Sequence, residues 1–190
     1  MNKHTLLILG LVALTPALHG CFPAVVAGAG GAVLVAEDRR SSGAIIDDST
    51  IEHKVSSRVS DKYGDRVHLD VTSYNRFVLL AGEVPTQEIK DDIGVIALGV
   101  ENARNVQNEL QVAPIASTST HANDAYLTSK VKTRFASENK FQVNHVKVVT
   151  ENGVVYLLGL VKRKEGQDAG EIASTTSGVQ KVVKVFEYID

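Results

Sequence analysis

The feature that most constrains the fold is an internal repeat that spans most of the chain. A pattern of apolar and basic side chains recurs at an offset of 76 residues, in which Ile51, Lys54, Val55, Arg58 and Val59 correspond to Leu127, Lys130, Val131, Arg134 and Phe135. Residues 71–84 match 148–161 at an offset of 77, which places Gly82 on Gly159. Such a repeat indicates one supersecondary unit used twice. We therefore expect two small domains, 47–113 and 123–190, joined by a Ser/Thr-rich linker at 114–122.

Each copy predicts the same order of secondary structure. Ser49 and Glu52 have the spacing of a capping box, and the apolar positions that follow predict a helix over 49–62, with a counterpart near Asp124. Asn152 and Gly153 between two β-branched runs predict a tight hairpin. The other expected elements are hairpin strands over 68–72, 77–82, 145–150 and 154–159, second helices over 86–100 and 164–177, and final strands over 105–112 and 181–189.

The expected fold class is therefore α+β, with two tandem α-β-β-α-β domains. In each domain, two helices should pack on one face of a three-stranded mixed sheet, because a sheet with one apolar face must bury that face against another layer. The sequence does not fix how the two domains are oriented.

The N-terminus has the features of an export signal. Lys3 precedes an apolar run over 6–18, which is too short to span a bilayer comfortably. The sequence Leu18-His19-Gly20-Cys21 resembles the cleavage box of bacterial lipoproteins, and Cys21 is the only cysteine. We expect residues 1–20 to be a lipoprotein signal peptide and 21–46 to be a lipidated N-terminus and tether. The alternative is an unmodified Cys21 in an ordinary signal sequence.

The two copies differ in charge. Residues 47–113 contain 7 Lys and Arg against 12 Asp and Glu, whereas residues 122–190 contain 10 against 8. The whole chain has a formal charge of -2, so it lacks the basic surface of a dedicated nucleic-acid binder. Only the second copy suits an anionic partner.

The first helix of the second copy offers a candidate surface for that partner. A tyrosine beside cations and hydroxyls is typical of a helix that lies at a membrane interface. The candidate phospholipid-binding residues are Tyr126, Leu127, Ser129, Lys130, Thr133, Arg134 and Ser137. The equivalent flank of the first copy has Thr50 at the position of Tyr126, so it lacks the aromatic ring. The alternative interpretation is an ordinary solvated helix face.

The sequence offers no pattern that predicts an enzyme, a metal site or a cofactor. No nucleophile with a base, and no set of metal ligands at workable spacing, stands out. His68 and His145 occupy equivalent positions of the repeat, and we expect both at the start of a strand and partly exposed. A metal or pH-sensing role for them remains open.

The order of elements, together with the similar runs at 78–82 and 155–159, resembles the BON domain family. A signal peptide, a lipoprotein box and two BON-like domains together resemble dual-BON outer-membrane lipoproteins. Phe22, where retention at the inner membrane would require Asp, implies the periplasmic leaflet of the outer membrane. The resemblance implies binding of anionic phospholipid through the second domain, with Tyr126 at the membrane-facing aromatic position, and a role in outer-membrane integrity. The alternative function is an adaptor that contacts the outer-membrane protein assembly machinery.

Overall fold

The computed structural model describes residues 38–190. The predicted signal peptide, Cys21 and most of the predicted tether lie outside these residues. Both copies of the repeat show the expected order of elements. The first comprises α2 (Ser42–Tyr63), β1 (His68–Tyr74), β2 (Phe77–Val84), α3 (Gln87–Leu98), β3 (Asn105–Asn108) and β4 (Gln111–Val112). The second comprises α4 (Thr118–Glu138), β5 (Lys147–Glu151), β6 (Val154–Val161), α5 (Arg163–Ser174) and β7 (Lys181–Tyr188).

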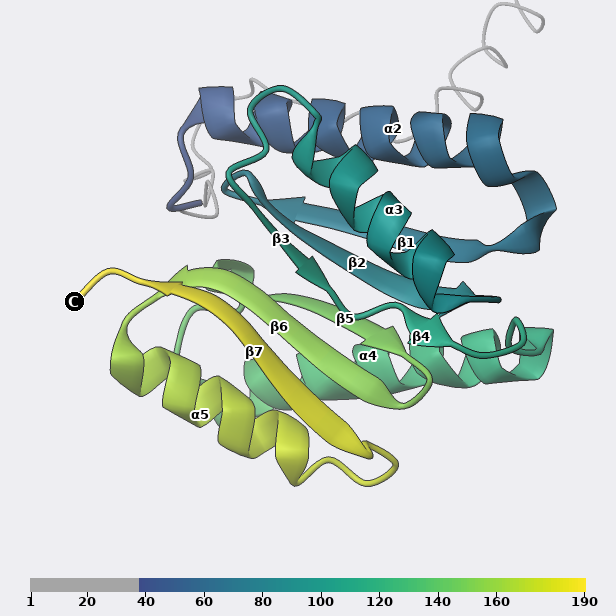
Figure 1. Cartoon of the computed structure of the whole chain (residues 1–190). Helices are drawn as coiled ribbons and strands as arrows, with labels where there is room; N and C mark the ends of the chain where they lie inside the picture. The colour runs from purple at the N-terminus through teal and green to yellow at the C-terminus, as the bar shows by residue number, and fades with distance from the viewer. Residues whose placement is uncertain (1–37) are drawn as a thin grey trace, which may run out of the picture. The chain divides into compact units, whose positions relative to one another are not determined.

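Each domain has a mixed sheet with its hairpin on one side and a parallel strand on the other. β2 lies antiparallel to β1 and parallel to β3 and β4. In the second sheet, β6 lies antiparallel to β5 and parallel to β7. The two helices of each domain cover the outer face of its sheet (Figure 1). The predicted α+β class and two-domain architecture are therefore confirmed.

The first helix of each domain starts earlier than the sequence pattern predicts. Ser41 caps α2 by accepting a hydrogen bond from the backbone N–H of Ala44, and Ser117 caps α4 in the same way. The proposed capping box at Ser49 is wrong, because Ser49 lies inside α2. Similarly, the predicted linker is helical from Thr118 onwards. Ser41 and Ser117 are themselves 76 residues apart, so the repeat extends further toward the N-terminus than the apolar pattern shows.

A buried aspartate on the first helix holds the hairpin turn in each domain. Asp124 accepts hydrogen bonds from the backbone N–H groups of Asn152 and Gly153, at 2.8 Å each. Asp48 accepts from the backbone of Asn75 and Arg76. Asp48 and Asp124 are equivalent residues of the repeat, and both buried carboxylates replace water as acceptors for turn N–H groups.

Several strand ends differ from the predictions by one or two residues, and two differences are larger. The last strand of the first domain is divided into β3 and β4, because Leu110 turns into the core between them. His145 lies in a short 3-10 helix, Val143–His145, and is buried rather than partly exposed at a strand start. His68 does begin β1, as predicted, and is partly exposed.

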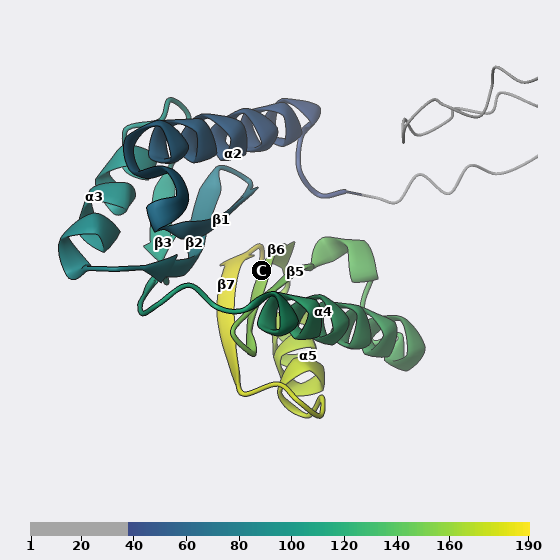
Figure 2. The ribbon, with the colours of Figure 1, turned by 90° about the vertical axis from the view of Figure 1, so that its right-hand side faces the viewer.

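Three apolar clusters hold the described residues together. Each domain has one such cluster between its helices and its sheet. The third joins the two sheets, since Tyr74, Leu79 and Ala81 pack with Tyr156, Leu158 and Leu160. The inner faces of the two sheets therefore face each other (Figure 2). This packing settles the orientation that the sequence left open.

Polar contacts surround this apolar interface. Lys147 of β5 donates to Glu52 of α2 at 2.9 Å, and the Asn152 side chain donates to Glu83 of β2. Arg39 donates to both carboxylate oxygens of Glu165 at the start of α5. The Arg39 guanidinium thereby lowers the pKa of Glu165 to about 2. None of the helices within residues 38–190 combines the length and apolarity needed to cross a bilayer.

Candidate functional site

The outer face of α4 carries an exposed aromatic ring beside a lysine. The Tyr126 side chain is 63% exposed, although it is large and partly apolar. The Lys130 ammonium lies 5.9 Å from the centre of the Tyr126 ring and donates to the backbone carbonyl of Ser177 at 2.8 Å. Among residues 38–190, no carboxylate oxygen lies within 4.0 Å of the Lys130 ammonium. This positive charge is therefore available to an anion at the surface.

Three exposed hydroxyls extend the same face along α4. Ser129, Thr133 and Ser137 each donate a hydrogen bond to a backbone carbonyl of their own helix. Their hydroxyl oxygens remain at the surface as acceptors. The face is thus polar and carries no acidic group at these positions.

Two of the seven predicted phospholipid-binding residues do not belong to this face. Leu127 is 2% exposed, because its position on the helix points inward. Arg134 is engaged with the end of α5, where it donates to the Ile172 carbonyl and to two threonine hydroxyls, and it pairs with Glu138 at 2.6 Å. Arg134 therefore satisfies the Ile172 carbonyl near the end of α5 and pairs with Glu138, so its guanidinium is already engaged within the domain.

The equivalent face of α2 differs at the positions that correspond to Tyr126 and Lys130. Thr50 stands in place of Tyr126, and Lys54 has Glu101 as an ionic partner at 3.9 Å. Arg58 donates to the Gly99 carbonyl, which parallels the role of Arg134. The aromatic ring and the lysine without an acidic partner are thus specific to the second domain.

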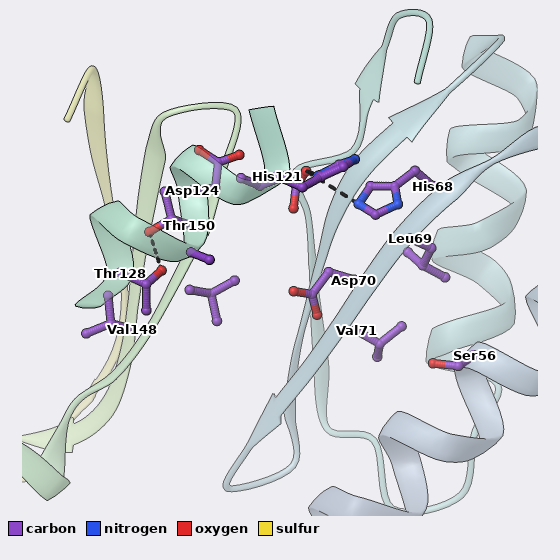
Figure 3. A pocket seen from close by; sticks show the side chains of 13 residues that line it. Ser56, His68, Leu69, Asp70, Val71, His121, Asp124, Thr128, Val148 and Thr150 are labelled. Carbon is purple, nitrogen blue, oxygen red and sulfur yellow. Dashed lines mark hydrogen bonds and ion pairs between the residues drawn. The ribbon is translucent and has the colours of Figure 1, made fainter. Parts of the chain in front are cut away.

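A second candidate site lies between the two domains. His68 of β1, His121 of α4 and Glu151 of β5 gather at one end of a cleft of about 600 Å³, in which His68 and His121 point toward each other (Figure 3). The His68 Nε2 atom lies 3.5 Å from Glu151 Oε1, and the His121 Nδ1 atom lies 3.6 Å from the same oxygen. The centres of the two imidazole rings are 4.4 Å apart.

The sequence shows no metal ligand close to His68, whereas the structure places His121 and Glu151 beside it. His121 falls in the segment that the sequence assigned to a linker, and only the packing of the two domains brings it to His68. A histidine pair built from separate domains leaves no spacing signal in the sequence. The pair can be predicted only when the arrangement of the two domains is known.

Glu151 lies in a strongly perturbed environment. Its side chain is only 7% exposed, and burial, together with the nearby carboxylates of Glu83, Asp124 and Asp70, raises its pKa to about 7. Carboxyl groups with strongly shifted pKa values are common in the clefts of functional sites, because such sites hold charged groups away from water. The cleft is therefore a site where an added positive charge is favoured.

The comparisons with known proteins agree with this architecture. The sequence model of the BON domain family matches residues 47–114 and 123–190. The chain belongs to the BON domain family. It is 41% identical over 182 residues to Outer membrane lipoprotein DolP of Haemophilus influenzae, which covers 95% of this chain and 94% of that protein.

Two other relatives are less similar to this chain. The chain is 30% identical over 154 residues to the 21 kDa hemolysin of Actinobacillus pleuropneumoniae, covering 80% of this chain and 79% of the relative. It is 32% identical over 144 residues to Osmotically-inducible protein Y of Escherichia coli, covering 74% and 72%. None of the three is named as an enzyme, and the expected absence of catalysis stays a prediction.

The predicted family is therefore confirmed. The chain is a dual-BON lipoprotein of the DolP type, lipid-anchored at the outer membrane.

Proposed function

We propose that this protein binds anionic phospholipid through the outer face of α4 and thereby helps to maintain the outer membrane. In this proposal Cys21 is the acylated N-terminus, which anchors the chain in the periplasmic leaflet. The lipid-contacting residues are Tyr126, Ser129, Lys130, Thr133 and Ser137. The single observation that carries the proposal is the exposed Tyr126 ring beside the Lys130 ammonium.

The physical chemistry of this pair suits a lipid headgroup. A tyrosine ring is stable at headgroup depth, because its body is apolar and its hydroxyl is polar. A lysine close to an anionic surface contributes about 1 kcal/mol. These contributions are small, but an acyl anchor holds the domain near the bilayer at high effective concentration, so a weak site suffices.

Replacement of Tyr126 and Lys130 by glutamate is expected to weaken vesicle binding strongly. We would test a chain that begins at residue 22, which lacks the anchor, for co-sedimentation with vesicles that contain phosphatidylglycerol. The double variant Tyr126→Glu with Lys130→Glu should lower retention about tenfold, because it removes the ring and places two negative charges at the surface. Retention of the unchanged chain should also fall with salt, since exposed charges are screened over about 8 Å at physiological ionic strength.

The first domain supplies the matched control. Thr50→Glu with Lys54→Glu introduces the same two side chains at the equivalent positions of α2 and should leave retention unchanged. Equal losses in both double variants would contradict a specific site on α4. Retention on purely zwitterionic vesicles without salt dependence would contradict the electrostatic mechanism.

An adaptor role is the second candidate, favoured by an apolar pair on α3. Val95 is 70% exposed and Leu98 is 59% exposed, one helical turn apart on the acidic first domain. The equivalent positions of α5 hold Glu171 and Ser174. The pair is exposed and apolar, although the equivalent residues of the second domain are polar. Such a pair is consistent with a protein contact.

Exchange of this pair separates the two candidates. Val95→Glu with Leu98→Ser installs the residues of the second domain and should not change vesicle retention, because the pair lies on the other domain. If the adaptor role is correct, this variant loses the ability to restore detergent resistance to cells that lack the gene. If it restores resistance as fully as the unchanged protein, the adaptor role at this surface is wrong.

A further inference from the structure

We propose that His68, His121 and Glu151 form a binding site for a divalent transition-metal ion, of which Zn²⁺ fits best. The three ligand atoms come from the two domains and lie within 4.8 Å of one another. This proposal is independent of lipid binding by α4.

The distances between the ligand atoms are close to those of a tetrahedral zinc site. Zinc binds imidazole nitrogen and carboxylate oxygen at about 2.0 to 2.2 Å, which places two tetrahedral ligands about 3.3 Å apart. The two nitrogen-to-oxygen distances here are 3.5 and 3.6 Å. Rotation of the two partly exposed histidine side chains would bring all three ligand atoms, which lie within 4.8 Å of one another, to coordination distance.

The Glu151 carboxylate oxygen at the centre of the cluster has no hydrogen-bond donor among residues 38–190. Glu151 Oε1 is buried and accepts no hydrogen bond within the described part of the chain. A buried acceptor without a hydrogen bond is costly, and a bound cation would satisfy it. Both histidine contacts converge on this same oxygen, so it points into the cluster.

The surrounding charge also favours a cation. Glu83, Asp124 and Asp70 are close enough to Glu151 to disfavour its negative charge, and a divalent ion would offset this repulsion. His68 and His121 are partly exposed along the cleft, so an ion and a completing water molecule have access. Three protein ligands with one open position are typical of zinc sites that retain a water.

The ligand set distinguishes between classes of metal. Magnesium and calcium prefer sites made of oxygen ligands, whereas two imidazoles and one carboxylate suit zinc, copper or nickel. A bound ion would join β1 of the first domain to β5 of the second. It would therefore stabilise the packing of the two sheets.

The test measures Zn²⁺ binding to the full-length protein in detergent after treatment with EDTA. We expect one high-affinity zinc ion per chain, measured by competition with a chromophoric chelator, and no competing effect of Mg²⁺ at a hundredfold excess. Zinc at 100 times its dissociation constant should raise the melting temperature by about 5 °C or more, because it binds only the folded state. The double variant His68→Gln with His121→Gln should lose at least 100-fold in affinity, and Glu151→Gln about 10-fold or more.

The matched control is His53→Gln, because His53 is exposed on α2 and is not a member of the cluster. It should bind zinc as the unchanged protein does. Absence of micromolar or tighter binding by the unchanged protein would overturn the proposal. So would unchanged affinity in the double variant, which would assign the ion to other histidines and leave the cluster as a histidine-carboxylate contact only. A melting temperature in EDTA close to that of the unchanged protein would show that each variant is folded.

Discussion

Substitution of Gly82 by alanine is expected to unfold the first domain. A Cβ atom at Gly82 would lie 2.2 Å from the backbone carbonyl oxygen of His68, and the residue has φ +120°, which side chains other than glycine rarely adopt. The obstructing atom is backbone in the paired strand β1, so it cannot rotate away. We expect a loss of about 4 kcal/mol or more in the free energy of unfolding, comparable to the stability of a small domain.

Chemical denaturation with detection by circular dichroism would measure this effect. Gly43→Ala is the matched control, because a Cβ there would meet nothing closer than 3.9 Å and the residue lies in the first turn of α2. That variant should be as stable as the unchanged protein or up to about 1 kcal/mol more stable. If Gly82→Ala loses less than about 1 kcal/mol, the close pairing of β1 with β2 at this position is wrong.

The same contact explains why the repeat preserves this glycine. Gly159, its equivalent, would place a Cβ 2.2 Å from the His145 carbonyl oxygen. The sequence alignment of the two copies predicted that the two glycines are equivalent, and this is confirmed. In both domains the structure places this glycine where the carbonyl group of a neighbouring backbone approaches too closely for a side chain. Side-chain patterns cannot indicate a contact with a carbonyl group.

Most of the fold was predictable because its signals are local. Apolar spacing at 55, 59, 131 and 135, and the turn residues Asn152 and Gly153, predict helices and hairpins without reference to the rest of the chain. The helix starts at Ser41 and Ser117 were missed, because Ser/Thr-rich segments usually indicate a linker. In this protein the serine caps, and the aspartates that are buried about two turns after them, extend the helices.

The candidate sites were predictable only in part for the same reason. Tyr126 and Lys130 lie on one helix face, so helical geometry alone places them together. The engagement of Arg134 with α5 and the approach of His121 to His68 depend on contacts between elements far apart in sequence. Such contacts determine which charged groups remain available, and single-sequence patterns do not contain them.

Loss of the Asp124 carboxylate is expected to be the second most damaging change. Its two oxygens accept hydrogen bonds from the N–H groups of Asn152 and Gly153, and these residues form the β5 to β6 turn with positive φ at both positions. Asp124→Ala would leave two N–H groups without acceptors in a buried environment. Each unsatisfied group costs about 1 to 3 kcal/mol, so we expect a loss of about 3 kcal/mol in the free energy of unfolding.

The neighbouring residue provides the control for this test. Asn123 is exposed, and Asn123→Ala should change the stability by less than about 0.5 kcal/mol. Asp124→Asn keeps the shape of the side chain but presents an NH₂ donor to one of the two turn N–H groups. It should therefore be destabilised almost as much as Asp124→Ala in denaturant titration. A stability of Asp124→Asn equal to that of the unchanged protein would show that only one of the two hydrogen bonds stabilises the turn. Native stability of Asp124→Ala would show that water replaces the carboxylate, and the assignment of this aspartate as the support of the hairpin would be wrong.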